Sequence, residues 1–134
     1  MLCTTPDTNG KTYMAREKLT ENFYKDEFSC RCGCGLDSID PTLVDILQCS
    51  RTATALTYEI SSGCRCEKHN KKVGGKPNSA HLRGKAADIT CVGSNMRYRM
   101  LKDFIQRFKR IEVCDSWLHV DIDLTLPQEV VFLN

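Results

Sequence analysis

The segment 117–124, WLHVDIDL, alternates aliphatic residues with aromatic or polar ones at every position. A period of two is that of a β-strand with one buried face. One parity holds four residues that are expected to face the core: Leu118, Val120, Ile122 and Leu124. The other parity is expected to face a cleft or water and holds Trp117, His119, Asp121 and Asp123. The chain must therefore build a sheet whose second face is polar, either as a site or as a solvated surface.

Two amphipathic segments predict helices that pack on this sheet. Asp40 suits an N-cap and Pro41 the first helical position, which predicts a helix over 41–55. Ser94 is expected to cap a second helix over 94–110. The apolar residues of this second helix recur at helical spacing and are expected to pack in the core: Met96, Met100, Leu101, Phe104, Ile105 and Phe108.

Further strands are expected at 56–61, LTYEIS, and at 85–92, KAADITCV. Together with the strand at 117–124 they predict an α+β fold in which helices flank a small antiparallel sheet. At 134 residues the chain fits one domain. The polar, weakly patterned residues 1–18 are expected to form an N-terminal arm, and residues 19–134 the single domain.

The charge pattern argues against two classes of partner. The 19 basic and 17 acidic residues give a net charge of +2, and the basic residues are scattered, so there is no electrostatic footprint for nucleic acid. No segment approaches the roughly twenty apolar residues of a membrane span, and the first thirty residues lack the apolar core of a signal peptide. We expect a monomer made in the cytoplasm that binds neither nucleic acid nor membranes.

A histidine and an aspartate stand seven residues apart in SAHLRGKAAD, residues 79–88. Seven residues with a central glycine do not place His81 and Asp88 on one helix face, but a loop, a turn at Gly84 and a strand can bring them together. With His119 they supply two imidazoles and one carboxylate, the ligand types and number of a catalytic zinc with an open position. An ordinary surface pair of His81 and Asp88 would explain the same spacing.

Three segments resemble the M15 metallopeptidases, the zinc D-Ala-D-Ala carboxypeptidase and endolysin-like family that shares its fold with the N-terminal domain of Hedgehog. Residues 79–88 match the signature S-x-H-x-x-G-x-A-x-D, and residues 62–75 match S-G-x-R-x-x-x-H-N-x-x-V-G-G. The segment WLHVD looks like the one that carries the third metal ligand of the family. The resemblance covers most of residues 20–123, in the expected order, and implies a Hedgehog/DD-peptidase-like fold.

The resemblance also implies roles for individual residues. Zinc is expected to bind to three side chains: His81, Asp88 and His119. Arg65 matches the arginine thought to stabilise the scissile carbonyl as it becomes an oxyanion, a sound role for a fixed guanidinium; the alternative for Arg65 is an exposed salt bridge. Ser79 is expected to bind near the substrate, or else only to cap the turn.

The general base is where this chain departs from the family. Many members carry Glu or Asp three residues before the last histidine, whereas this chain has Ser116 there and Asp115 one position earlier. Asp115 is expected to be the base, although an unbroken strand would place it about 13 Å from His119, so a bulge or turn is needed. Asp121 is the other candidate, or it orients an imidazole instead.

We therefore expect a zinc-dependent peptidase that hydrolyses peptide bonds in bacterial cell-wall (peptidoglycan) stem peptides, of the D-Ala-D-Ala carboxypeptidase or endolysin type. The lack of an export signal fits a phage product delivered to the wall or carried in a virion. The alternative is a cell-wall or protein binding module that keeps the fold and the zinc but has lost catalysis. A cysteine-rich domain that binds nucleic acid is disfavoured by the near-neutral charge.

Nine cysteines are many for this length, and an odd number cannot all pair within one chain. Without an export signal, free or metal-bound thiols are expected rather than a disulfide framework. Four thiolates could hold a second, structural zinc if drawn from five that stand in C-x-C pairs: Cys30, Cys32, Cys34, Cys64 and Cys66. That spacing is tighter than the usual C-x(2–4)-C, so the alternative is that they are buried hydrophobes or idle thiols. Cys91 and Cys114 are expected in the core.

Overall fold

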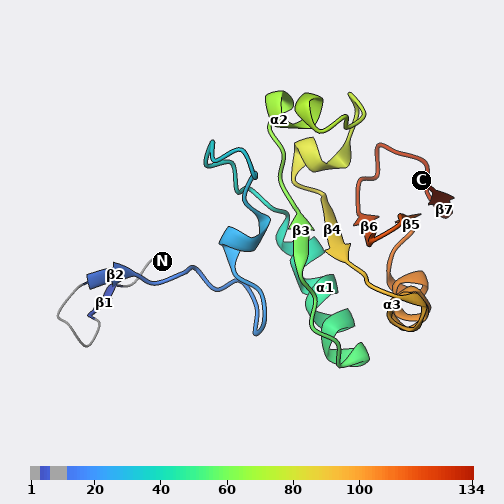
Figure 1. Cartoon of the computed structure of the whole chain (residues 1–134), viewed down its shortest axis with the longest axis horizontal. Coiled ribbons are helices and arrows are strands. Elements are labelled where there is room, and N and C mark those ends of the chain that lie inside the picture. Colours follow the sequence, from blue (N-terminus) through green and yellow to red (C-terminus); the bar gives the residue numbers. More distant parts are fainter. Residues whose placement is uncertain (1–3, 7–11) are drawn as a thin grey trace.

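The structure is a computed structural model that describes residues 4–6 and 12–134. Its elements, in chain order, are β1 (Thr4–Pro6), β2 (Thr12–Met14), η1 (Lys25–Phe28), α1 (Pro41–Thr54), β3 (Ile60–Ser62), α2 (Glu67–Lys72), η2 (Ala80–Arg83), β4 (Ala86–Thr90), α3 (Ser94–Arg107), β5 (Arg110–Val113), β6 (Trp117–Asp121) and β7 (Val130–Leu133). The strands β1 and β2 pair with each other and project away from the rest of the chain (Figure 1). The predicted arm, residues 1–18, lies partly outside the described residues and stays a prediction.

The main sheet has the strand order β3-β4-β6-β5-β7. The first four strands pair antiparallel, as expected, whereas β7 pairs parallel with β5. The parallel pairing follows from the path of the chain. Strand β6 runs antiparallel to β5, with Val120 opposite Ile111, and therefore ends beside the start of β5. Residues 122–129 then carry the chain to the other edge of β5, where β7 runs in the same direction as β5. The predicted α+β class is confirmed, and the sheet is mixed because of this added edge strand.

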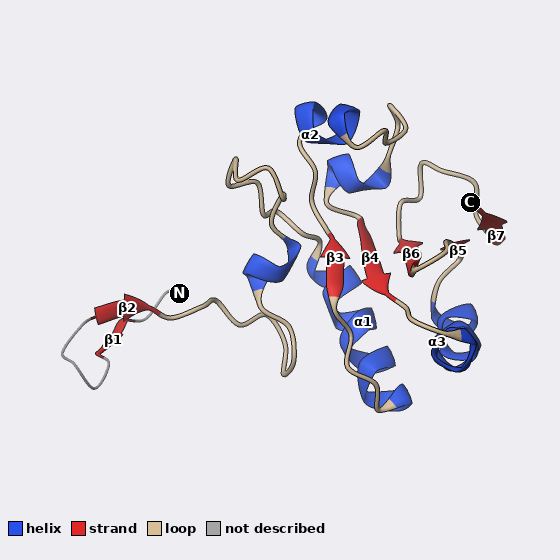
Figure 2. Ribbon diagram, in the orientation of Figure 1, coloured by secondary structure: helices blue, strands red, loops and turns tan. Residues whose placement is uncertain are grey.

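One face of the sheet packs on α1 and α3, which lie side by side at one end of the molecule, while α2 and η2 lie at the opposite end (Figure 2). The packed face is aliphatic, with Ile89, Ile111, Leu118 and Val120 at most 1 % exposed. Because side chains alternate along each strand, the opposite face of β4, β5 and β6 carries the polar residues of the same strands. This face holds the candidate site.

Several sequence expectations at element ends were wrong. Leu124 is 83 % exposed because β6 ends at Asp121 and the chain turns there. Ile105 is 61 % exposed, since it is rotated about 100° from the buried Phe104 on the helix. Ser94 is the first helical residue, so Gly93 takes the N-cap position, and α3 ends at Arg107 because Phe108 is already extended.

In the part of the chain that the structure describes, no helix has the length and apolar character of a membrane span.

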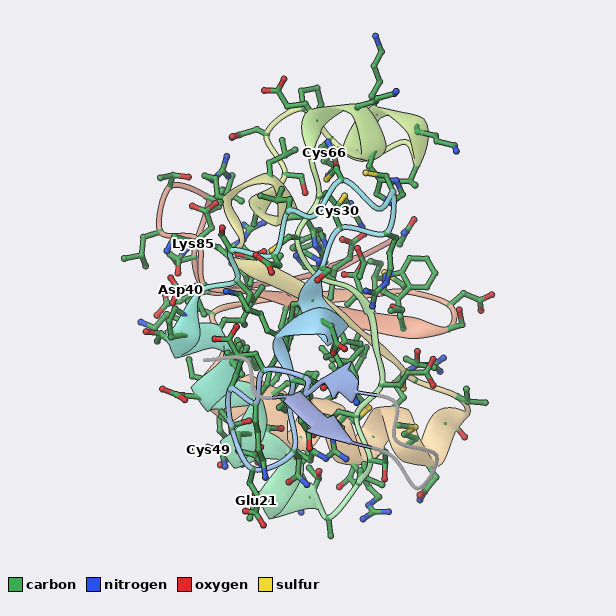
Figure 3. The ribbon with its side chains drawn as sticks, turned by 90° about the vertical axis from the view of Figure 1, so that its left-hand side faces the viewer. Glu21, Cys30, Asp40, Cys49, Cys66 and Lys85 are labelled. Atoms are coloured by element: carbon green, nitrogen blue, oxygen red, sulfur yellow. The ribbon has the colours of Figure 1, made fainter. Side chains whose placement is uncertain are left out.

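The start of α1 gives a stability prediction. The Asp40 carboxylate accepts the backbone N–H of Thr42 at 2.8 Å and pairs with Lys85, which stands just before β4 (Figure 3). Replacing Asp40 with alanine should lower the free energy of unfolding by about 1–2 kcal/mol, because an N-cap is lost. Urea denaturation at pH 7 measures the change, and Asp45→Ala, an exposed position on the same helix, should change it little.

The contribution of Asp40 to the free energy of unfolding should decrease in acid. The hydrogen bond with Lys85 lowers the pKa of Asp40 below its ordinary value of 3.8, while burial opposes the shift. A lowered pKa in the folded state gives a contribution that is present above pH 3.8 and is lost as pH falls through the folded pKa. The difference in unfolding free energy between wild type and Asp40→Ala should therefore shrink below pH 3.8. A difference that grows in acid would contradict this account.

Candidate metal and catalytic site

Three predicted ligands come together on the polar face of the sheet, from η2, β4 and β6: His81, Asp88 and His119. One ligand atom from each lies within 4.8 Å of those of the other two. The side chains are buried, and Asp88 stands directly opposite His119 in the antiparallel register. Two imidazoles and one carboxylate thus converge from segments that are far apart in the sequence.

The seven-residue step from His81 to Asp88 consists of a single turn of helix, a glycine and a strand. The Ser79 hydroxyl accepts the His81 backbone N–H at 3.3 Å and so caps η2. Gly84 ends η2 with a φ of +67°, and a Cβ on this residue would lie 2.2 Å from the carbonyl oxygen of Ser38. Glycine is therefore required by both conformation and space, and the predicted loop, turn and strand are confirmed.

The hydrogen bonds of the imidazoles aim their free nitrogens at the same point. His81 Nδ1 lies 2.6 Å from the Gly63 carbonyl oxygen, which can only accept, so Nε2 is left as the acceptor and faces Asp88 Oδ1 at 3.2 Å. His119 Nε2 lies 2.8 Å from Asp121, and His119 Nδ1 lies 2.9 Å from the same oxygen of Asp88. Two imidazole nitrogens and a carboxylate oxygen face one another here, an arrangement that calls for a cation, either a proton or a metal ion, between them.

Hydrogen bonds among these side chains shift the pKa values of His119 and Asp88. Burial lowers the pKa of His119, but hydrogen bonds to Asp121 and Asp88 outweigh burial and raise this pKa to about 9. Burial raises the pKa of Asp88, but hydrogen bonds with His119 and His81 outweigh it and hold that pKa below the ordinary range. In the protein without metal, a proton on His119 stabilises the carboxylates, and a divalent cation among the same donors would displace it.

Asp121 orients His119 and is not free to accept a proton from a substrate. Its carboxylate accepts from His119 Nε2, from Arg110 Nε at 2.9 and 3.0 Å and from the Asp123 backbone N–H at 3.2 Å. Asp121 is 1 % exposed. Of the two roles left open for Asp121, the contacts favour the orientation of the imidazole, as is common for histidine ligands of metals.

Arg65 holds the other oxygen of Asp88. Its Nη2 donates to Asp88 Oδ2 at 3.1 Å, its Nε to Ser62 Oγ at 3.0 Å and its Nη1 to Asn70 Oδ1 at 3.3 Å. The side chain is only 14 % exposed, so the alternative of an exposed salt bridge is wrong. The role of Arg65 toward an oxyanion stays a prediction, as does a contact of Ser79 with substrate, because the structure shows the Ser79 hydroxyl only as the cap of η2.

A cavity of about 800 Å³ opens over this face of the sheet. Arg65, Ser79 and the three converging residues line it, together with residues 73–76, which lead from α2 toward η2. Trp117 and Phe132 add aromatic surface to the lining, and Lys76 adds a cation. The cavity is of a size typical of small-ligand sites, so a short peptide segment can reach the converging donors.

Asp115 is not part of this cavity. It is exposed, in the turn that joins β5 to β6, and its carbonyl oxygen accepts from Arg97 at 3.1 Å. The turn is closed by the Cys114 N–H, which donates to the Trp117 carbonyl oxygen at 3.1 Å, so the chain reverses beyond the end of the sheet and carries Asp115 outward. This turn leads away from the site, so its geometry does not support Asp115 as the base, and that role stays a prediction.

Glu112 on β5 is the acidic residue that the sequence reasoning missed. It stands directly opposite His119 in the antiparallel register, and it lines the cavity. Directly opposed residues point to the same face with Cβ atoms about 4.5–5.5 Å apart. The signal was present in the sequence, since Arg110, Glu112 and Cys114 alternate with Ile111 and Val113 just as the residues of β6 alternate.

Comparison with known proteins agrees with this geometry. A family model described as peptidase M15 matches residues 21–121, more than half of the chain. The matched range contains the three converging residues and also Arg65, Glu112 and Asp121. A search of curated proteins found no match. The site and the matched range together show that the chain belongs to the peptidase M15 family.

Proposed function

We propose that the protein is a zinc-dependent peptidase that hydrolyses peptide bonds in the stem peptides of bacterial cell walls, as a D-Ala-D-Ala carboxypeptidase or an endolysin-type endopeptidase. The observation that carries the proposal is the convergence of His81, Asp88 and His119 within 4.8 Å under an open cavity. Two imidazole nitrogens and one carboxylate oxygen fit zinc, which in catalytic sites keeps its fourth position open.

The residues around this site can share the work of hydrolysis. When bound, zinc supplies a Lewis acid and lowers the pKa of water to about 7. Glu112 is placed to take a proton from the attacking water and to return it to the leaving amine. Arg65 fixes Asp88 and presents a guanidinium to the cavity, where negative charge develops on the carbonyl oxygen. Asp121 holds the ring of His119.

The substrate class is supported by the shape and charge of the cavity. Lys76 adds a cation at the cavity wall, which suits the free carboxylates that stem peptides carry. Val73 is 52 % exposed and, with Trp117 and Phe132, offers apolar surface for short side chains such as that of alanine. These features, together with membership of the family, favour a cell-wall peptide over an extended protein substrate.

The test is an assay of the purified, zinc-loaded protein on isolated cell-wall sacculi and on purified muropeptides, with the products identified by mass spectrometry. Release of a terminal alanine would assign a carboxypeptidase, and cleavage within the stem or cross-link would assign an endopeptidase. If the protein sediments with sacculi but cleaves no stem peptide at any zinc concentration, the binding module that has lost catalysis is the correct interpretation.

Loss of the negative charge beside His119 Nε2 should weaken metal binding. Asp121→Asn is expected to lower the affinity for zinc by about 10–100-fold, because a carboxylate that orients a histidine ligand also raises its basicity. Competition with a chromophoric chelator measures the affinity. The matched control is Asp103→Asn, which also removes a carboxylate paired with an arginine, on α3 and away from the cavity, and should leave the affinity unchanged. Equal affinities in wild type and Asp121→Asn would contradict this role.

A further inference from the structure

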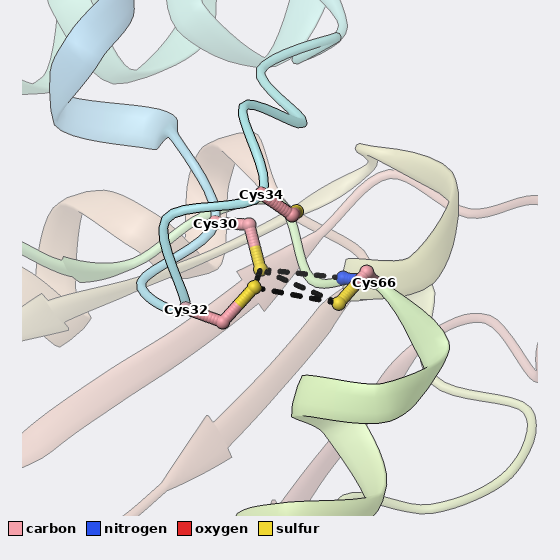
Figure 4. A group of neighbouring side chains, drawn as sticks. All are labelled: Cys30, Cys32, Cys34 and Cys66. Atoms are coloured by element: carbon pink, nitrogen blue, oxygen red, sulfur yellow. Dashed lines mark hydrogen bonds between the residues drawn. The ribbon is translucent and has the colours of Figure 1, made fainter.

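Outside the cavity, four sulfur atoms gather at one point between the loop after η1 and the start of α2 (Figure 4). This thiol cluster consists of Cys30, Cys32, Cys34 and Cys66. We infer that the thiol cluster is a second metal site that holds a structural zinc ion. It shares no residue with the catalytic site, and it does not depend on the proposed peptidase activity.

The distances are those of ligands around one ion. Cys30 Sγ lies 3.5 Å from Cys32 Sγ and 3.9 Å from Cys66 Sγ, and the last two lie 3.6 Å apart. Cys34 Sγ is within 4.8 Å of the others. A tetrahedral site with Zn–S bonds of about 2.3 Å places its sulfur atoms about 3.8 Å apart. A disulfide would need about 2.05 Å, so these cysteines are thiols already arranged around a common centre.

The loop that carries three of these cysteines is shaped to turn them inward. Gly33 and Gly35 in CRCGCG adopt φ angles of +83° and +88°, a conformation that favours glycine. The Gly33 N–H donates to the Cys30 carbonyl oxygen at 3.2 Å, and the Cys30 N–H donates to the Leu36 carbonyl oxygen at 2.7 Å, which closes the loop. These turns explain how a C-x-C spacing, tighter than that of most zinc motifs, can still converge.

Backbone donors face the sulfur atoms as well. The Cys66 N–H lies 3.4 Å from Cys30 Sγ, and the His69 N–H lies 3.4 Å from Cys66 Sγ. Hydrogen bonds to sulfur favour the thiolate, which is the form that binds metal. Four thiolates this close would repel one another without a cation, so the arrangement is complete only with a divalent ion at its centre.

The other cysteines in the described part of the chain differ from those of the cluster. Cys64, the fifth candidate from the sequence, is 2 % exposed and belongs to the hydrophobic core, as expected for Cys91 and Cys114, which are also buried. In the cluster, by contrast, Cys32 and Cys34 are exposed, so packing does not explain them. Cys49 is exposed too but lies on α1, well away from Cys30 and Cys66 (Figure 3), and serves as an internal control.

A zinc ion in the cluster would fasten the loop after η1 to the segment that supports the catalytic site. Cys66 directly follows Arg65, whose backbone N–H donates to the His81 carbonyl oxygen at 3.1 Å. The Cys64 N–H donates to the Phe28 carbonyl oxygen at 2.8 Å, and the Gly63 carbonyl oxygen binds His81 Nδ1. The ion would therefore stabilise the position of Arg65 without touching a substrate.

The test uses the full-length wild-type protein, purified in zinc with a reductant that does not chelate metal. Metal analysis should find two zinc ions per chain. Alkylation with iodoacetamide followed by peptide mass spectrometry should modify Cys49 at once and leave Cys32 and Cys34 unmodified, although all three are exposed. After treatment with a strong chelator, Cys32 and Cys34 should react as fast as Cys49. This measurement needs no variant that might fail to fold.

Two variants separate this site from the catalytic one. The double variant Cys32→Ser, Cys34→Ser should lose one zinc ion, and His119→Ala should lose the other while Cys32 and Cys34 remain protected. Cys49→Ser should keep both ions. Rapid alkylation of Cys32 and Cys34 in zinc-saturated wild type would overturn the inference, as would iron in place of zinc. If only the catalytic site fails to bind zinc, the wild type holds one zinc ion, and Cys32 and Cys34 remain protected from alkylation.

Discussion

The His119→Ala variant is expected to lose the zinc ion of the catalytic site and essentially all hydrolysis of cell-wall peptides. Loss of an outer partner of a metal ligand costs about 10–100-fold, and removal of the ligand itself should lower kcat/KM by well over 100-fold. His119 supplies one of three donors, and its replacement also leaves the carboxylates of Asp88 and Asp121 without the group that lies between them. Metal analysis and product release from muropeptides measure the two losses together.

A control must separate this loss from misfolding. Wild type treated with a chelator should also lose activity and recover it when zinc is added back, whereas His119→Ala should not recover. Circular dichroism should show the same helix content in both, because α1 and α3 pack on the opposite face of the sheet. If the variant hydrolyses muropeptides at the wild-type rate without the zinc ion of the catalytic site, the ligand role of His119 and the proposed chemistry are both wrong.

The parts of the site that could be predicted from the sequence are those set by local rules. The alternation of residues 117–121 placed His119 and Asp121 on one face and Leu118 and Val120 on the other, as the structure has them. The turn at Gly84 follows from the short span between His81 and Asp88. A resemblance to the peptidase M15 family joined these segments, and only such a resemblance could, because nothing local brings η2 next to β6.

Features that depend on where the chain reverses could not be predicted from local patterns. The parity of a strand puts Asp115 on the same face as His119, but the turn between β5 and β6 leaves it outside the cavity. The parallel edge strand β7 and the exposure of Leu124 follow from the end of β6 at Asp121, which no local pattern marks. The sequence also could not decide between Cys64 and Cys66 for the thiol cluster, since both flank Arg65. The fold turns the side chain of Cys64 into the core and that of Cys66 toward the cluster.

Substitution of Glu112 is expected to lower the rate of hydrolysis strongly, and comparison with Asp115 tests which carboxylate is the general base. Glu112→Gln keeps the size of the side chain and removes its ability to accept a proton, so kcat should fall by about 10²–10⁴-fold while KM and zinc content stay near those of wild type. Asp115→Asn, an equally conservative change at the exposed position in the turn, should leave kcat within about 2-fold, as surface changes usually do.

Comparison of Glu112→Gln with Asp115→Asn is informative because both residues carry a carboxylate and they differ in their position relative to the cavity. Glu112 on β5 lies opposite His119 on β6 and lines the cavity, whereas Asp115 is exposed beyond the end of the sheet. A fall in kcat in Asp115→Asn but not in Glu112→Gln would mean that the turn between β5 and β6 folds over the cavity when substrate binds. A fall in both kcat and zinc content in Glu112→Gln would instead make Glu112 a group that supports the metal, and water would then have to lose its proton to another acceptor in the cavity.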